Sequence, residues 1–223
     1  NWVPSQKIIN NDKKIHFLKT HNALCTINGN KFTDEFNTMA AIYIVRDPRN
    51  LITSLSHHYE IDLKEAFHFL TNKRKTIFPI NFMNSDKVKN SHQDVNFLGD
   101  WSGHYKSWKN IGFCPIKIIK YEDILLDTRA VFISILEFLS QFIKLEIKKE
   151  KISKSLNSTS FEILSQIEKE QGFDEATVSY KTKQKVKFFN LGKKNDWKKL
   201  LDNETIKKID NAFKSEMREL NYL

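Results

Sequence analysis

The chain has 223 residues, of which 36 are Lys or Arg and 27 are Asp or Glu, so its formal net charge is +9. This length suits one domain with a substantial core, and a hydrophobic content of 40% excludes wholesale disorder. The positive charge favours an anionic partner, either nucleic acid, a membrane surface or a phosphorylated small molecule, without choosing among them.

The cysteine content and the hydropathy of the chain limit the cellular surroundings that it suits. Cys25 and Cys114 provide neither a disulfide framework nor a metal-ligand spacing, so no metal site is predicted. No apolar run approaches the ~20 residues that span a bilayer, and no signal peptide is visible. A reducing cytoplasm fits this pattern best.

Two short elements are expected before the first buried strand. Residues 1–12 are mostly polar and are expected to be irregular, whereas residues 14–19 (KIHFLK) predict a strand that ends at Thr20 and His21. Asn28-Gly29-Asn30 is typical of a turn. Residues 41–45 (AIYIV) then form a continuous apolar run, which predicts a strand buried on both faces.

The junction that follows this strand is the first candidate site. Arg46 comes directly after the strand, Asp47 suits an N-cap and Pro48 suits the first turn of a helix that runs to about Tyr59. Ligands bind at the carboxyl ends of parallel strands, and helix N-termini favour phosphate. Arg46 and Ser54, two turns into the helix, therefore predict a phosphate clamp. The alternative is that Arg46 pairs with Asp47 or another carboxylate and merely ends the strand.

The remaining pattern alternates helices with one further strand, over residues 115–121. The aromatic residues 97, 101, 105 and 108 recur at helical spacing and indicate a core-facing helix. Residues 71–92 suggest a long loop that would cover an acceptor site. The class expected is α/β, a parallel sheet with helices on both faces in one domain over residues 1–223. The expected helices cover residues 62–70, 94–110, 128–142, two segments within 148–171 separated near 157–160, and 204–220.

Two other stretches carry residues suited to chemistry. His21 follows a predicted strand and could take a proton from a hydroxyl or amine, and Lys19 could balance charge on a transferring anion. The alternative for His21 is a structural role. In the tail, Gly192 next to Lys193 and Lys194 would permit close approach of an anion, although a surface turn explains the same residues.

Taken in order, these segments resemble the cytosolic-type sulfotransferases, which use 3′-phosphoadenosine 5′-phosphosulfate (PAPS). The resemblance extends from Lys19 to Lys198 and implies a P-loop nucleotide-kinase-like fold of three layers. It rests on Lys19-Thr20-His21, Ile44 to Asn50 with Ser54, Trp101-x-x-His104-x-x-Ser107-Trp108, Tyr121-Glu122-Asp123, Thr159-Ser160-Phe161, and Phe188-Phe189-x-x-Gly192 with Asp196-Trp197-Lys198.

The resemblance also implies roles for individual residues. Arg46 and Ser54 would hold the 3′-phosphate of the nucleotide, and Gly192 and Lys193 would close that site from the tail. His21 would be the general base toward a small hydroxyl or amine acceptor, Lys19 would stabilise the sulfuryl group during in-line transfer, and no metal would be needed. The adenine pocket would be lined by Tyr121, Thr159 and Phe161, with Ser160 nearby.

The sequence departs from the family pattern in two places. Where the family usually has Arg-Lys-Gly in the tail, this chain has Asn190-Leu191-Gly192, so an arginine contact to the 3′-phosphate is lost unless Lys193 or Lys194 substitutes. The glycine-rich loop that cradles the 5′-phosphosulfate in the family has no counterpart here. We therefore expect an N-terminally incomplete member, weak or inactive by itself, whose exposed sheet edge would invite homo-oligomerisation.

Three functional hypotheses follow from the sequence. The first is sulfuryl transfer from PAPS, the second is a non-catalytic remnant that still binds 3′-phosphoadenosine nucleotides, and the third is a basic nucleic-acid-binding domain. The third rests on net charge alone and predicts binding that ignores Arg46 and weakens steeply with salt. Replacing His21 separates the first two, since turnover should vanish while nucleotide binding persists.

Overall fold

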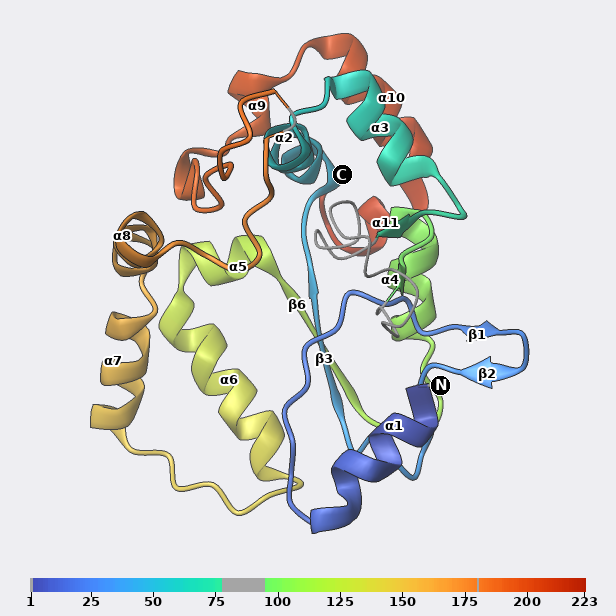
Figure 1. Cartoon of the computed structure of the whole chain (residues 1–223), viewed down its shortest axis with the longest axis vertical. Helices are drawn as coiled ribbons and strands as arrows, with labels where there is room; N and C mark the ends of the chain where they lie inside the picture. Colours follow the sequence, from blue (N-terminus) through green and yellow to red (C-terminus); the bar gives the residue numbers. More distant parts are fainter. Residues whose placement is uncertain (1, 78–94, 180) are drawn as a thin grey trace. The chain divides into compact units, whose positions relative to one another are not determined.

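The computed structural model of the chain describes residues 2–77, 95–179 and 181–223 (Figure 1). It divides into two compact units, each assembled from two stretches of the chain. Unit 1 comprises residues 1–44 and 71–118, and unit 2 comprises residues 45–70 and 119–223. The loop expected over residues 71–92 lies mostly outside the described residues, because residues 78–94 are among those not described.

Unit 1 begins with a helix that the sequence pattern did not predict. Residues 2–12 form α1 (Trp2–Ile9) and the short 3-10 helix η1 (Asn10–Asp12), so the expectation of an irregular segment is wrong. The Trp2 ring meets the Phe32 ring edge-on at 5.4 Å between centroids. Gln6 Nε2 donates to the Phe32 carbonyl at 2.8 Å. These tertiary contacts stabilise a helix whose local sequence gives little signal.

The strand predicted over residues 14–19 is also wrong, because this stretch is extended without a ladder partner. Ile15, Phe17 and Leu18 are 51, 70 and 62% exposed. The turn at Asn28-Gly29 is confirmed: β1 (Thr26–Ile27) pairs antiparallel with β2 (Asn30–Lys31). Both loop residues have positive φ, 49° and 78°, as a two-residue hairpin turn requires.

The predicted aromatic helix is confirmed in part as α4 (Trp101–Lys109). It begins later than expected because Asp100 caps it, accepting from the Gly103 amide at 2.6 Å. Phe97 instead lies in β5 (Asn96–Phe97), which pairs antiparallel with β4 (Thr76–Ile77). The buried side chains of α4 are Trp101, Tyr105 and Trp108, as the spacing predicted.

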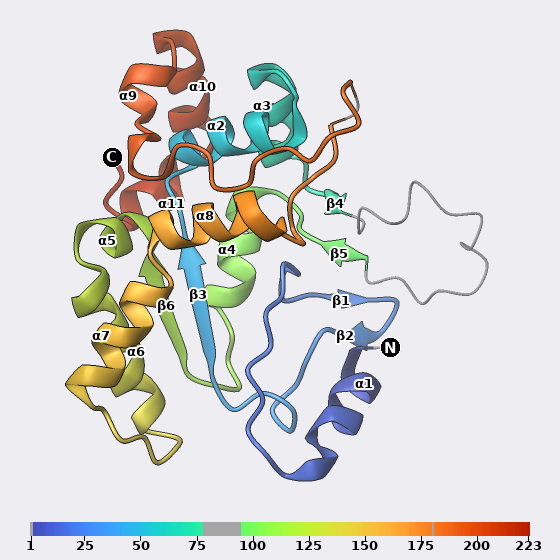
Figure 2. The same cartoon turned by 60° about the vertical axis from the view of Figure 1, so that its left-hand side comes forward.

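A pair of parallel strands, β3 (Ala41–Val45) and β6 (Ile116–Lys120), confirms the α/β class, and the boundary between the units crosses both strands. Each strand leads into a helix at its carboxyl end, α2 (Pro48–Tyr59) after β3 and α5 (Tyr121–Leu126) after β6 (Figure 2). The prediction that β3 is buried on both faces is wrong, since Ile42 and Ile44 are 38 and 56% exposed.

Unit 2 is mostly helical, and several of its helices match the sequence pattern. Asp62 and Asp127 accept hydrogen bonds from the amides of Glu65 and Ala130 and so cap the helices that begin beside them, within or next to the predicted ranges 62–70 and 128–142. The break predicted near residues 157–160 separates two helices, as expected. Besides α2 and α5, the helices are α3 (Leu63–Thr71), α6 (Thr128–Ser140), α7 (Lys149–Ser158), α8 (Phe161–Gln171), η4 (Gly192–Lys194), α9 (Trp197–Leu200), α10 (Asn203–Ala212) and α11 (Lys214–Glu219).

The core of unit 2 lies where α10 packs on α2. Ile52, Ile209 and Met217 are fully buried there. The single helix predicted over residues 204–220 is two helices, because the chain leaves helical geometry at Phe213 before α11 begins. Among the helices that the structure describes, none is long and apolar enough to cross a membrane.

Candidate nucleotide-binding and catalytic residues

The β3–α2 junction adopts the predicted local structure. Asp47 Oδ1 accepts from the Arg49 amide at 2.8 Å, and Pro48 occupies the first turn of α2. The Asp47 amide in turn donates to Glu122 Oε1 at 3.1 Å, which ties the start of α2 to the start of α5. The helix N-terminus and the end of β3 are therefore fixed by local capping and by one tertiary hydrogen bond.

Arg46, directly after β3, is held on two sides. Its Nη1 donates to Ser54 Oγ at 2.9 Å, and its guanidinium carbon lies 4.5 Å from the Tyr121 ring centroid. Its Nε is buried and has no hydrogen-bond partner among the residues that the structure describes. Burial lowers the pKa of Arg46, although Tyr121, Glu122 and Asp47 partly oppose that shift.

The alternative reading, in which Arg46 pairs with Asp47, does not hold for this structure. Within residues 2–77, 95–179 and 181–223, no carboxylate forms an ion pair with Arg46. Asp47 pairs instead with Arg49, at 2.7 Å between Oδ2 and Nη2. A partly buried guanidinium with an unsatisfied N–H and no ion pair among the described residues is suited to an anionic ligand.

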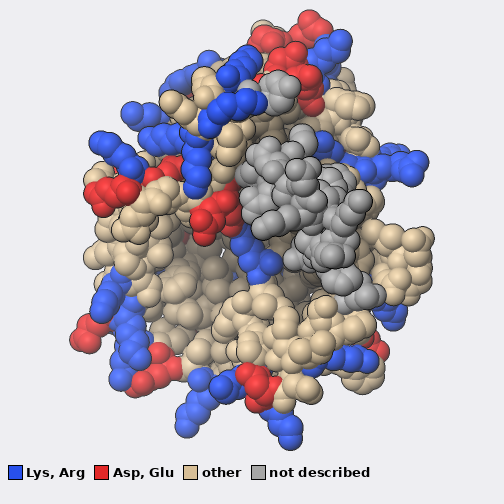
Figure 3. All heavy atoms as spheres, viewed as in Figure 1, with Lys and Arg blue, Asp and Glu red and all other residues tan. Residues whose placement is uncertain are grey.

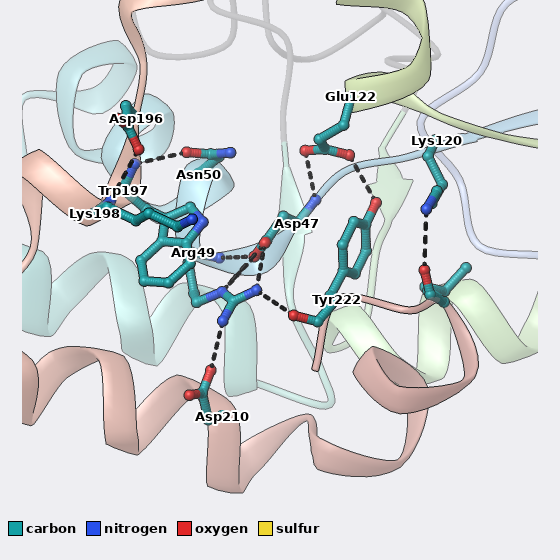
Figure 4. A network of polar contacts seen from close by, with 11 residues as sticks. Asp47, Arg49, Asn50, Lys120, Glu122, Asp196, Trp197, Lys198, Asp210 and Tyr222 are labelled. Carbon is teal, nitrogen blue, oxygen red and sulfur yellow. Dashed lines mark hydrogen bonds and ion pairs between the residues drawn. The ribbon is translucent and has the colours of Figure 1, made fainter. Parts of the chain in front are cut away.

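Arg49 occupies a contrasting, fully paired environment (Figure 4). Its side chain contacts both oxygens of Asp47, and it reaches Asp210 at 3.4 Å and the Tyr222 carbonyl at 2.7 Å. Its guanidinium also lies 4.0 Å from the Trp197 ring centroid. The Tyr222 hydroxyl donates to Glu122 at 2.8 Å, so the C-terminal residues close a network around the start of α2.

The tail brings two predicted residues together. Gly192 has φ of +53°, and a Cβ placed there would lie 2.8–3.0 Å from the Phe161 ring, so only glycine fits without movement. Phe161 also meets Phe189 edge-on at 6.0 Å between ring centroids. Lys193 and Lys194 are exposed on η4, the turn that follows Gly192.

Thr159 and Ser160 form the α7–α8 connection. Thr159 Oγ1 donates to the Ser155 carbonyl at 2.8 Å, and Ser160 Oγ accepts from the Ile163 amide at 3.3 Å as the N-cap of α8. Both hydroxyls therefore have structural partners in α7 and α8. Phe161 follows directly and remains about one-third exposed, at 36%.

Lys19 and His21 belong to unit 1, whereas the predicted nucleotide-binding residues belong to unit 2. Both Lys19 and His21 are exposed. The His21 carbonyl accepts from His104 Nε2 at 3.2 Å, and His104 Nδ1 lies 2.9 Å from the Tyr43 hydroxyl. His104 on α4 thus anchors the main chain at His21, a role that the Trp-x-x-His spacing alone did not reveal.

The tautomer of His104 follows from its partners. A carbonyl only accepts, so Nε2 carries the proton, and Nδ1 accepts from Tyr43 when the ring is neutral. Burial lowers the pKa of His104, while the bond to the His21 carbonyl partly opposes that shift. Burial also raises the pKa of the Tyr43 hydroxyl, which keeps it a donor.

Residue Asn195 is a further member of the Arg46 site that the sequence did not indicate. Its side chain is buried and contacts Asn50, Thr53 and Ser54 of α2. An asparagine within a basic tail carries no recognisable pattern, so no signal in the sequence could have identified it. The structure therefore brings Arg46, Ser54 and Tyr121 together with Asn195, and separately Phe161 with Gly192.

Basic side chains do not gather into one patch on the face shown in Figure 3, where Lys and Arg are interspersed with Asp and Glu. The basic run over residues 144–154 lies mostly on exposed positions, and only its residues from Lys149 onward belong to a helix, α7. Among the described residues, no group of three or more His, Cys, Asp or Glu side chains is arranged to hold a metal ion.

Comparisons with known proteins show the family to which the chain belongs. A family model described as "Sulfotransferase domain" matches residues 4–221. No curated protein sequence matches the chain. Among the solved structures that match is the mouse sulfotransferase SULT7A1 complexed with PAP, with 18% sequence identity and a TM-score of 0.49. That match covers 81% of this chain and 58% of the mouse chain, so this chain spans less than two-thirds of its length. Because the family model covers nearly the whole chain, the protein belongs to the sulfotransferase domain family.

Proposed function

We propose that this chain is part of an enzyme that transfers a sulfuryl group from PAPS to a hydroxyl or amine of a small acceptor. The observation that carries the proposal is the partly buried guanidinium of Arg46 at the carboxyl end of β3, whose Nε is buried and which forms no ion pair with the described residues. A cation left without a counter-ion in a desolvated position is costly unless an anion joins it. The 3′-phosphate of the nucleotide is the anion that we assign to it.

The nucleotide-binding role would be shared among residues of unit 2. Arg46 Nη1 and Nε and the Ser54 hydroxyl would donate to the 3′-phosphate, and Gly192 and Lys193 would approach it from the tail. The adenine ring would lie near Phe161, whose ring is partly exposed, and near Thr159 and Ser160. Tyr121 supports this arrangement by packing against the Arg46 guanidinium at 4.5 Å from its ring centroid.

The chemical step would use residues of unit 1. His21 would take the proton of the acceptor hydroxyl or amine, whose oxygen or nitrogen then attacks sulfur. The bond between sulfur and the bridging phosphate oxygen breaks, and 3′-phosphoadenosine 5′-phosphate (PAP) leaves with that bond pair. Lys19 would stabilise charge on the sulfuryl group during the transfer.

The two half-buried free cysteines, Cys25 and Cys114, fit a reducing cytoplasm.

The first test is calorimetric titration of the purified chain with PAP and with 5′-AMP, which lacks the 3′-phosphate. We expect PAP to bind and 5′-AMP to bind much more weakly, and Arg46→Ala to remove the difference. Arg129→Ala serves as the matched control, because Arg129 is exposed on α6 and, among the described residues, donates to the exposed hydroxyl of Ser153 alone. Equal affinities of the unaltered chain for both nucleotides would overturn the proposal.

The catalytic half of the proposal has its own test. His21→Ala should remove any sulfuryl transfer from PAPS while leaving the affinity for PAP unchanged. Turnover that survives this substitution would exclude His21 as the base. Binding of PAP without any turnover in the unaltered chain would favour the non-catalytic nucleotide-binding remnant.

A further inference from the structure

We infer that Asn195 determines specificity for a phosphate group by fixing Ser54 as a hydrogen-bond donor in the Arg46 site. The inference rests on the proposed function, since it assumes that this site takes the 3′-phosphate. It adds a residue of the tail to the site and a reason why the site would discriminate phosphate from hydroxyl. The argument starts from the orientation of the Asn195 amide.

The amide orientation of Asn195 is set by its neighbours. Asn195 Nδ2 lies 3.0 Å from the Asn50 carbonyl oxygen, which can only accept, so the nitrogen must face that carbonyl. The other hydrogen of Nδ2 then points to Ser54 Oγ, at 2.9 Å. Asn195 Oδ1, on the opposite side of the amide, accepts from Thr53 Oγ1 at 2.6 Å.

Ser54 Oγ consequently accepts two hydrogen bonds. One comes from Asn195 Nδ2 and the other from Arg46 Nη1, each at 2.9 Å, and neither nitrogen can accept. A hydroxyl has two acceptor lone pairs and one hydrogen, so the acceptor capacity of Ser54 is filled. Among the described residues, no acceptor is recorded for its hydrogen, which is therefore left for a ligand.

The Ser54 hydroxyl, which can only donate here, and the unpaired guanidinium N–H of Arg46 together favour a ligand that accepts hydrogen bonds and carries negative charge. A phosphomonoester dianion offers only acceptors and satisfies both groups. A ribose hydroxyl in the same place offers a hydrogen for which Ser54 has no lone pair left, and it carries no charge for Arg46. The site therefore favours nucleotides with an ionised 3′-phosphate over those with a free 3′-hydroxyl.

Asn195 also connects this donor to the basic tail. Its backbone amide donates to the Gly192 carbonyl at 3.1 Å, so the turn that presents Lys193 and Lys194 is joined to α2 through one side chain. If Asn195 only held the turn in place, replacing it would affect the binding of all nucleotides alike. If Asn195 acts by positioning Ser54, its replacement should change PAP affinity only while Ser54 is present.

The experiment is a double-mutant cycle on nucleotide binding with Asn195→Ala, Ser54→Ala and both together. PAP and 5′-AMP are titrated by calorimetry, and Asn211→Ala, at an exposed asparagine of α10 outside the proposed site, is the matched control. We expect each single variant to lose about tenfold or more in PAP affinity, the size of a hydrogen bond to a charged group, with 5′-AMP affinity unchanged. The double variant should lose little more than Ser54→Ala alone.

A second variant keeps the inference testable if Asn195→Ala does not fold. Asn195→Asp retains the oxygen that faces Thr53 but replaces the donor that faces Ser54 with an acceptor. The Ser54 hydrogen should turn toward it, and PAP affinity should fall further than in Asn195→Ala because a negative charge is also added. Retention of PAP affinity in Asn195→Asp would overturn the inference.

The outcomes separate the inference from the proposed function. If the unaltered chain does not prefer PAP to 5′-AMP, the proposed function fails and the inference with it. If that preference exists and Asn195→Ala keeps it, only the inference fails. Additive losses in the double variant, or equal losses for both nucleotides, would show that Asn195 only holds the turn in place and would also overturn the inference.

Discussion

The surroundings of Arg46 and Arg49 differ sharply although the two residues are three positions apart in the chain. Arg49 is buried against two carboxylates, a carbonyl and an indole ring, and all of these groups belong to the protein. Arg46 has one neutral hydroxyl, one aromatic ring and a buried Nε without a partner. Full internal pairing indicates a structural arginine, and incomplete pairing indicates one that awaits a ligand. Four measurements test this distinction, beginning with the largest expected effect.

Replacing Arg49 should affect stability most. Arg49→Ala leaves Asp47 buried without its counter-ion, which costs about 3–5 kcal/mol and lowers the melting temperature by roughly 10 °C. Chemical and thermal denaturation measure this loss. The matched control is Lys198→Ala, because Lys198 is exposed and lies 5.6 Å over the same Trp197 ring. An Arg49→Ala protein as stable as the control would contradict the interpretation of Arg49 as the structural arginine of the two.

Replacing Arg46 should affect binding rather than stability. Arg46→Ala removes a partly buried cation that forms no ion pair with the described residues, so we expect a change in unfolding free energy within about 1 kcal/mol. We expect a loss of about 100-fold in PAP affinity, as for two hydrogen bonds between charged groups. Denaturation and calorimetry on the same preparation give both values. A loss of stability as large as that of Arg49→Ala would show that Arg46 is structural too.

The hydroxyl of Tyr222 offers a smaller test of the Arg49 network. Tyr222→Phe removes one hydrogen bond to Glu122, whose other oxygen still accepts from the Asp47 amide, so we expect a loss of about 1 kcal/mol in unfolding free energy. Tyr59→Phe is the control, since Tyr59 is partly exposed on α2 and packs by its ring against Phe69. Equal stability of the two variants would show that the Tyr222 hydroxyl does not stabilise the fold through the Arg49 network.

Residue His104 extends the comparison to a partly buried group whose hydrogen-bond partners among the described residues, the Tyr43 hydroxyl and the His21 carbonyl, are both neutral. Its pKa is lowered in the folded protein, so the unfolded chain binds the proton more tightly. The free energy of unfolding should be highest above pH ~6.5, the pKa of histidine in the unfolded chain, and should fall as the pH drops below that value. Unfolding at pH 7.5 and pH 5.5 measures this slope. His104→Gln should flatten it, and an unchanged slope would show that other groups cause it.

Much of the β3–α2 junction could be predicted from the sequence. The apolar run of β3, the Asp47 cap and Pro48 form a local pattern, and the structure confirms both the strand and the helix. Gly29 at its turn and Asp127 at the start of α6 were predictable for the same reason, because each acts on neighbours within a few residues. In the structure Arg46 donates to Ser54 and packs against the Tyr121 ring, and the nucleotide-binding roles that the resemblance to sulfotransferases implies for these residues stay predictions.

Local sequence is enough to locate the start of a strand or helix when a cap, a turn or an apolar run marks the point. Contacts between distant parts of the chain set the pairing of Arg49, rather than Arg46, with the carboxylate of Asp47, since the further partners of Arg49, Asp210 and Tyr222, lie about 160 residues or more along the chain. Such contacts also decide that α1 is a helix, that residues 14–19 form no strand, and that Asn195 faces Ser54. Hydrogen bonds and packing between distant residues set these features, and local propensity carries no information about such partners.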